Sequence, residues 1–159
     1  LSQIDFLSRE IELVESEIGS IIQSNNDLKA VSDCLKSIPA VGKLTAAILT
    51  NYLLSGDFKT ANQFTAFAGL APQKRDSGTS VRGRQSLTRY GNRKLRASLF
   101  MPAMVVLRRG YFSAFVERLK SKGKPEMLIL GAIMRKLIVV AFNVYKKCEK
   151  YDARRYQSV

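Results

Sequence analysis

Apolar residues recur at alternating steps of three and four along the first 24 positions of the chain. Acidic residues lie between them, and the apolar set is Ile4, Leu7, Ile11, Val14, Ile18 and Ile21. A stripe with this period is typical of an amphipathic helix, and its seven-residue repeat is typical of a coiled coil. The pattern predicts a long coiled-coil-like helix. That helix could pack on its own domain, fold back on residues 28–35 after a break at residues 24–26, or pair with a second copy.

Helical periodicity continues through most of the remaining chain and is interrupted at proline and glycine. One helix is expected to end before Pro39, a second to begin after Gly42, and a short third to cover residues 60–69. The strongly apolar segment 127–145 is expected at the centre of the fold, and an amphipathic helix should precede it at 111–120. The basic, polar tail from residue 146 is expected to fray. The predicted fold class is therefore mainly α.

The middle of the chain departs from this pattern. Residues 73–85 are polar and without periodicity, so we expect an exposed loop or an irregular hairpin near Val81. A helix is expected to start at Ser86 or Thr88 and to run through residue 106. Gly91-Asn92 could break it, and Pro102 is expected to kink it.

Net charge divides the chain into an acidic and a basic part. The whole chain carries 26 Lys and Arg against 13 Asp and Glu, a formal net charge of +13. Residues 1–37 hold three basic and seven acidic residues, whereas the rest holds 23 basic and six acidic residues. An excess of this size favours a polyanionic partner, and nucleic acid is the commonest one.

The basic residues concentrate between positions 74 and 96, where Asp76 is the only acidic residue. A solvated helix face usually mixes both signs of charge, so a segment of one sign favours a surface that binds phosphates. The predicted nucleic-acid-binding residues of this segment are Lys74, Arg75, Arg82, Arg84, Arg89, Arg93, Lys94 and Arg96.

A second candidate phosphate site is the turn Ile38-Pro39-Ala40-Val41-Gly42. Such a turn leaves free backbone N–H groups at the start of the next helix, where Gly42 permits close approach and Lys43 adds positive charge. It is similar to a helix-hairpin-helix, although Ala40 occupies the position of the usual first glycine. A purely structural helix-turn-helix accounts for it equally well.

Residue content excludes several kinds of chemistry. The chain has no histidine, which excludes a Ser-His-Asp triad and histidine-ligated metals. Cys34 and Cys148 have no paired spacing and are interpreted as structural thiols. The carboxylates of the basic part are scattered, so a two-metal site is not expected. The sequence shows no apolar run approaching the length of a membrane span and no signal-peptide pattern. We therefore expect an intracellular protein that has no membrane partner.

Ser77, followed by Gly78, is the candidate nucleophile because it lies inside the basic segment. Without a histidine, its activation would depend on arginines that hold a phosphodiester and stabilise developing negative charge, with Arg75, Arg82 and Arg84 nearest in sequence. The alternative is that Ser77 is only a turn residue.

Four segments in order carry a family resemblance. They are the turn at 38–46, Phe67-Ala68-Gly69-Leu70-Ala71-Pro72, Ser77-Gly78, and Gly91-Asn92-Arg93-x-Leu95-Arg96. From about residue 35 to 145 the chain resembles the serine-bearing C-terminal domain of the DEDD-type insertion-sequence transposases. This is the family of the Piv and MooV DNA invertases and the bridge-RNA-guided recombinases.

The resemblance implies an acidic coiled-coil-like connector at 1–36, a DNA-binding and recombination domain at 37–150 and a basic tail at 151–159. It implies that Ser77 attacks DNA to form a phosphoserine intermediate, although Asp76 stands where the family often has another serine. A RuvC-like domain with four acidic residues and bound Mg²⁺ would complete the enzyme, and no counterpart lies in these residues. The implied partners are DNA, a structured guide RNA and a second copy of the chain, in the bacterial cytoplasm at the nucleoid.

Two other interpretations remain open. In one, the chain is a non-catalytic nucleic-acid-binding helical module. In the other, the acidic helix is the functional part and binds protein.

Overall fold

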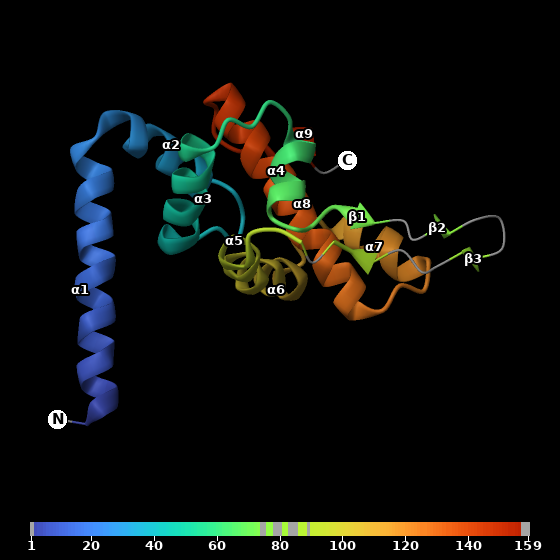
Figure 1. The fold of residues 1–159 in the computed structure, drawn as a ribbon, viewed down its shortest axis with the longest axis horizontal. Helices are drawn as coiled ribbons and strands as arrows, with labels where there is room; N and C mark the ends of the chain where they lie inside the picture. Colours follow the sequence, from blue (N-terminus) through green and yellow to red (C-terminus); the bar gives the residue numbers. More distant parts are fainter. Residues whose placement is uncertain (1, 74–75, 78–80, 83–85, 89, 157–159) are drawn as a thin grey trace.

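The computed structural model describes residues 2–73, 76–77, 81–82, 86–88 and 90–156, and of residues 73, 76–77, 81–82 and 86 it describes the backbone alone. Helices account for most of these residues and four two-residue strands for the rest of the regular structure, which confirms the mainly-α class (Figure 1). The helices are α1 (Gln3–Ser24), α2 (Asn26–Lys36), α3 (Lys43–Ser55), α4 (Ala61–Phe67), α5 (Arg93–Ser98), α6 (Phe100–Arg109), α7 (Ser113–Ser121), α8 (Glu126–Lys147) and α9 (Ala153–Tyr156). The strands are β1 (Pro72–Gln73), β2 (Asp76–Ser77), β3 (Val81–Arg82) and β4 (Ser86–Leu87).

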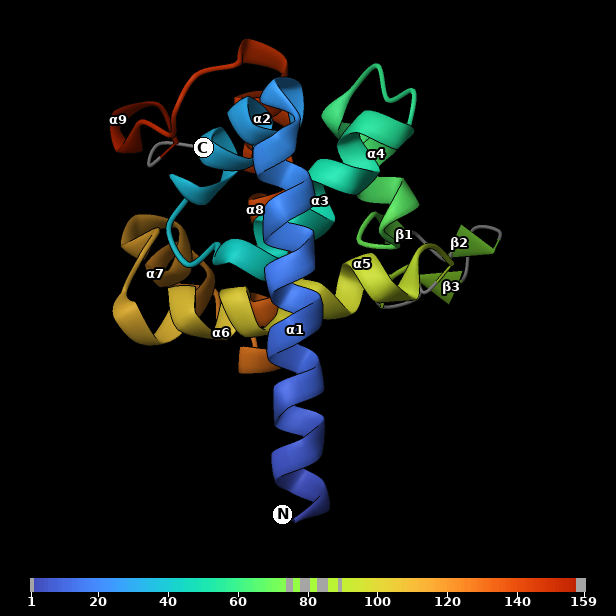
Figure 2. The ribbon, with the colours of Figure 1, turned by 90° about the vertical axis from the view of Figure 1, so that its left-hand side faces the viewer.

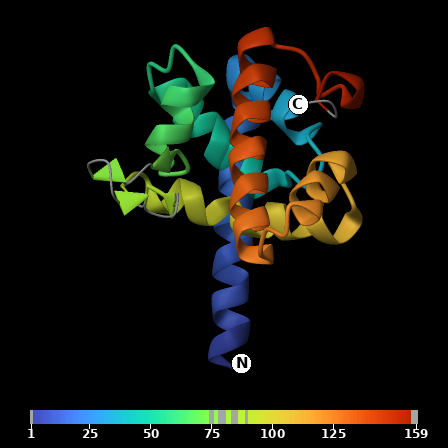
Figure 3. The ribbon, with the colours of Figure 1, turned by 90° about the vertical axis from the view of Figure 1, so that its right-hand side faces the viewer.

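Helix α8 is the centre of the fold, as its apolar sequence predicts. It packs against α2, α3, α4, α6 and α7, and Figure 3 shows it running across the middle of the domain. The helix is long and apolar enough to cross a membrane, which the sequence pattern had not indicated. However, 67% of its most apolar 18-residue window is buried within the domain. Its apolar character is therefore explained by packing on several sides.

Helix α1 begins with a capping box in which the Ser2 hydroxyl accepts the N–H of Asp5 and the Asp5 carboxylate accepts the N–H of Ser2. Most of α1 projects beyond the other helices (Figure 2), and none of its residues is buried. Its contacts with α2 and α3 involve the end near Ile18 and Ile22. Packing on its own domain therefore accounts for the C-terminal end of α1 and leaves the apolar stripe toward its N-terminus exposed.

The turn between α2 and α3 is closed by backbone hydrogen bonds. The N–H of Ile38 donates to Leu35 and the N–H of Val41 donates to Ile38, both over 3.1 Å. Ala40 has a φ of 68°, in the left-handed region that favours glycine. Its conformation explains why glycine is the more common residue at this position of such a turn.

The expected helix start at Ser86 or Thr88 is wrong. Ser86 and Leu87 instead pair with Gln73 and Pro72 in an antiparallel register, and the N–H of Thr88 donates to the carbonyl of Ala71 over 2.9 Å. Pairing with β1 gives the backbone of Ser86 and Leu87 its hydrogen-bond partners, so these residues form a strand and not the first turn of a helix. The helix begins only at α5.

The expected kink at Pro102 is also wrong. The break between α5 and α6 lies at Leu99, and Pro102 occupies the first turn of α6. The first hydrogen bond across that turn runs from the N–H of Ala103 to the carbonyl of Leu99. Pro102 therefore removes no helical hydrogen bond.

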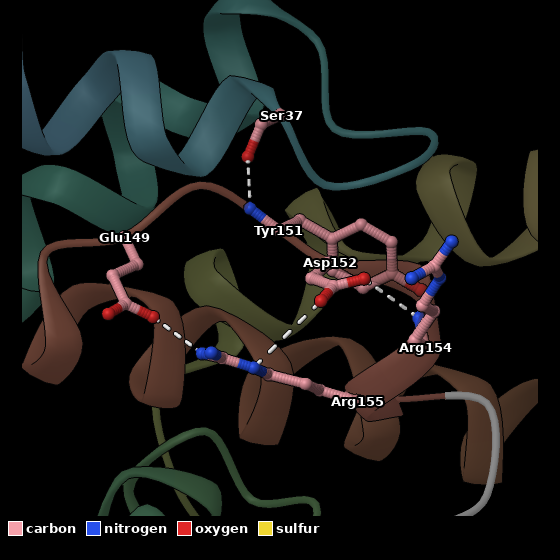
Figure 4. Close-up of polar contacts among 6 residues, drawn as sticks. All are labelled: Ser37, Glu149, Tyr151, Asp152, Arg154 and Arg155. Carbon is pink, nitrogen blue, oxygen red and sulfur yellow. Dashed lines mark hydrogen bonds and ion pairs between the residues drawn. The ribbon is translucent and has the colours of Figure 1, made fainter.

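The C-terminal segment packs on the domain. The N–H of Tyr151 donates to the Ser37 hydroxyl over 2.7 Å, and Arg155 pairs with Glu149 over 2.6 Å (Figure 4). The Tyr151 ring lies edge-on to Phe112 and stacks on Tyr156. The expectation of a frayed tail is therefore wrong for residues 151–156, because two aromatic residues anchor this polar segment.

Candidate nucleic-acid interface

Two glycines bring the segment after α4 against the segment before α5. The N–H of Asn92 donates to the carbonyl of Phe67 over 2.7 Å, and a Cβ added to Gly91 would lie 2.4 Å from the backbone nitrogen of Gly69. Both glycines have positive φ values, 69° for Gly69 and 150° for Gly91. Two of the four resemblance-bearing segments therefore meet at a backbone contact that only glycine permits.

Asn92 joins this contact to α3 and starts α5. Its side-chain oxygen accepts the N–H of Leu95 over 2.9 Å, which caps the helix, and also accepts the Tyr52 hydroxyl over 3.3 Å. The sequence pattern had suggested a helix break at Asn92 and not a helix start. An asparagine directly before a helix-forming run is a typical N-cap, and this signal could have placed the start of α5 correctly.

Arg96, one of the predicted nucleic-acid-binding residues, contacts the protein's own backbone through its guanidinium group. Its Nη1 donates to the carbonyl of Ala68 over 3.1 Å, and its side chain is half-buried. A Cβ on Gly69 would lie 2.4 Å from the same nitrogen, so the guanidinium occupies the space that the glycine leaves. Arg96 holds α5 to the end of α4, and its contact with DNA stays a prediction.

Arg93 and Lys94 occupy the first turn of α5 and are both exposed. The salt bridges found in the described part of the chain involve neither of them. Their positions agree with a surface that binds phosphates, because both cations reach solvent from a short helix whose orientation is fixed at Asn92.

Gly42 and Lys43 lie exposed at the start of α3, as expected for the turn. No side chain caps this helix, and a Cβ on Gly42 would meet no atom within 4 Å. The groove beside Lys43 is also lined by Lys36 and by Glu12 and Glu15 of α1. Carboxylates therefore share the surroundings of Lys43, which makes it less open to an anion than Arg93 or Lys94.

Ser77 lies in β2, which pairs with β3 in an antiparallel register of Asp76 with Arg82 and Ser77 with Val81. This hairpin projects away from the helices in two perpendicular views (Figures 1 and 3). At its base, Leu87 of β4 lies against α8, where a Cβ on Gly131 would be 3.0 Å from the Leu87 Cδ1. The hairpin thus carries the backbone of Ser77 and Arg82 on a base packed on the core helix.

The remaining predicted residues of the basic segment, Lys74, Arg75, Arg84 and Arg89, lie outside the described residues, and of Arg82 and Ser77 only the backbone is described. Their roles stay predictions. Within the described residues, no three acidic, histidine or cysteine side chains gather as metal ligands. The Mg²⁺ site that the resemblance implies for a further domain stays a prediction.

Comparison with known proteins decides the family. The sequence model described as Transposase IS116/IS110/IS902 family matches residues 32–117, more than half of the chain. The chain belongs to this transposase family. The matched region contains the turn at Gly42, the Gly69–Gly91 contact, the hairpin of Ser77 and the whole of α5.

Individual relatives of this transposase-family chain extend the likeness beyond the matched region. The chain is 33% identical over 153 residues to the pilin gene-inverting proteins of Moraxella lacunata and of Moraxella bovis, covering 94% of itself and 48% of each relative. It is 29% identical over 155 residues to an uncharacterized 43.6 kDa protein of insertion element IS110 from Streptomyces coelicolor, covering 96% of itself and 37% of that protein. The chain thus spans about half or less of the length of these curated relatives.

Proposed function

We propose that this chain is the DNA-binding and strand-exchanging part of a transposase or site-specific DNA recombinase. Membership of the transposase family, together with the likeness to proteins that invert a pilin gene, supports this function. The observation that carries it is the exposed, basic start of α5 next to a projecting hairpin that contains the candidate serine. Such a surface suits the phosphodiester backbone as a ligand.

Ser77 is proposed as the nucleophile. Its hydroxyl oxygen would form a bond to a DNA phosphorus while the bond from phosphorus to one strand-end oxygen breaks, and that oxygen would take the proton. The protein would then hold one DNA strand as a phosphoserine until a second strand end reverses the reaction. Arg75, Arg82 and Arg84 would stabilise the negative charge on the phosphate oxygens.

The complete enzyme would need a RuvC-like domain with four acidic residues to hold Mg²⁺, which would supply a second centre for phosphoryl transfer. A structured guide RNA would be a further partner, and the DNA substrate implies action at the nucleoid in the bacterial cytoplasm. The helix-hairpin-helix-like turn at Gly42 and Lys43 would add a contact to the DNA backbone that does not depend on sequence.

Pairing of two copies through α1 is part of the same proposal. The apolar stripe is exposed on the projecting part of the helix, with Ile4 75%, Ile11 59% and Val14 53% accessible. A heptad stripe that its own domain does not cover is the surface that a coiled-coil dimer buries.

The nucleophile is tested in the full-length recombinase with a DNA substrate that traps covalent protein–DNA adducts. Ser77→Ala is expected to abolish the adduct, whereas Ser80→Ala, which removes a neighbouring hydroxyl, should leave it unchanged. An adduct that persists in Ser77→Ala would show that another residue attacks the DNA.

The non-catalytic alternative predicts DNA binding without any adduct. Binding itself is tested with Arg82→Ala combined with Arg84→Ala, measuring DNA affinity over a range of salt concentrations. The logarithmic salt slope should fall by about 0.9 for each lost phosphate contact. An unchanged slope would remove both arginines from the interface.

A further inference from the structure

Tyr90 has the most exposed large apolar side chain in the described part of the protein. Its accessible fraction is 85%, compared with 75% for Ile4 and 72% for Met127. A tyrosine ring ordinarily contributes to a folded protein by packing, and this one packs on little of its own chain. The ring is therefore available to an external partner.

The backbone that carries Tyr90 is held on both sides. Before it, the N–H of Thr88 donates to Ala71 over 2.9 Å; after it, the N–H of Asn92 donates to Phe67 over 2.7 Å. Gly91, the next residue, packs on the backbone of Gly69. Because the backbone is already held in place, binding through this ring orders only the side chain. The entropy cost of binding is therefore small.

The surroundings of Tyr90 indicate the chemistry of the partner. Arg93 and Lys94 are exposed within the next four residues, and the sequence has no acidic residue from Ser77 to Val116. An aromatic ring beside cations is the combination that binds single-stranded nucleic acid, in which bases stack on the ring and phosphates contact the cations. An apolar protein surface would gain nothing from these charges.

We propose that Tyr90 stacks on a nucleobase of a DNA strand that has left the duplex, with Arg93 and Lys94 holding the flanking phosphates. This inference rests on the proposed DNA-binding function and identifies the form of DNA bound. Within an intact duplex both faces of a base are covered by its neighbours, so a side chain can stack only where the stack is opened.

The test compares two DNA oligonucleotides of equal length, one a normal single strand and one an abasic strand with the same phosphates. Tyr90→Ala should weaken binding to the normal strand by about 5- to 150-fold, the range expected for one base–aromatic stack. Tyr90→Phe should bind as the unsubstituted protein does, and no variant should change binding to the abasic strand. Tyr111→Ala, which removes an exposed tyrosine beside Arg108 and Arg109, is the matched control and should have no effect.

A second measurement follows the ring itself. The chain contains no tryptophan, so Tyr90→Trp introduces a single reporter. Its fluorescence should be quenched by the normal strand and not by the abasic strand. Equal losses of affinity on both strands, or a Tyr90→Ala variant that binds normally, would overturn the stacking proposal while leaving DNA binding intact. A failure of the unsubstituted protein to bind any DNA would instead overturn the proposed function, and the stacking proposal with it.

Discussion

Gly91 lies so close to Gly69 that a Cβ on Gly91 would be 2.4 Å from the Gly69 backbone nitrogen. The contact joins two segments that are 22 positions apart in sequence and sets the direction in which α5 leaves the hairpin. It connects the stability of the domain to the placement of its exposed basic residues.

Replacement of Gly91 by alanine should destabilise the protein strongly. The added methyl group would overlap backbone atoms, and the φ of 150° is strained for any residue with a side chain. We expect a loss of about 2–4 kcal/mol in the free energy of unfolding, measured by urea denaturation. Gly42→Ala is the matched control, because its Cβ would meet nothing and its φ is −82°, so its cost should be at most about 1 kcal/mol. Equal costs for the two variants would contradict the contact.

Arg96 and Arg93 should have different effects although they share one short helix. Arg96→Ala removes the donor to the Ala68 carbonyl and should lower the free energy of unfolding by about 1–3 kcal/mol. Arg93→Ala removes an exposed side chain and should change stability by less than about 0.5 kcal/mol, while lowering DNA affinity and the salt slope. Urea denaturation and DNA titration on both variants measure the difference. The assignment fails if Arg93→Ala is the less stable of the two.

Ala40→Gly should stabilise the protein, although glycine usually destabilises. Ala40 has a φ of 68°, where a Cβ costs about 1 kcal/mol and glycine does not. The gain is partly offset by the greater freedom of glycine in the unfolded chain, so the expected increase is about 0.5 kcal/mol. Thermal denaturation would detect it as a higher midpoint, and a lower midpoint would show that Ala40 is not strained.

Substitutions on α1 should show whether dimerisation depends on the apolar stripe or on any exposed apolar residue of the helix. Val14 and Leu13 are adjacent and similarly exposed, 53% and 59%, but only Val14 belongs to the heptad stripe. Val14→Glu should shift a dimer to monomer in analytical ultracentrifugation, because it would place a charge in the buried stripe. Leu13→Glu should leave the dimer intact. If both variants behave as the unsubstituted protein does, α1 does not mediate association.

The two cysteines should differ in their reaction with iodoacetamide. Burial raises the pKa of the half-buried Cys34 thiol, whereas Cys148 is exposed. Since the thiolate is the reactive form, Cys34 should be labelled more slowly at neutral pH and should need a higher pH than an ordinary thiol. Mass spectrometry after timed quenching measures both sites. Between the ordinary thiol pKa and the raised pKa of Cys34, the folded protein keeps the thiol proton and the unfolded chain has lost it. The free energy of unfolding should therefore fall as the pH rises through this range. Equal labelling rates would contradict the burial of Cys34.

Elements with local signals can be identified from the amino-acid sequence alone. The heptad spacing of α1 and the apolar length of α8 each identify a helix, because helical periodicity is a property of consecutive residues. The charge of the basic part, the absence of histidine and the order of the four segments likewise require no coordinates. They were sufficient to indicate the family.

Features that depend on contacts between distant residues became visible with the folded structure. Ser86 and Leu87 form a strand because Pro72 and Gln73 lie opposite them, and no pattern in the local sequence indicates this pairing. Arg96 turns inward to Ala68 while Arg93, three residues earlier, faces solvent. Tyr90 is exposed directly before Gly91, whose backbone is held against Gly69. In each case the deciding interaction joins residues far apart in sequence, where local propensities are too weak to determine the outcome.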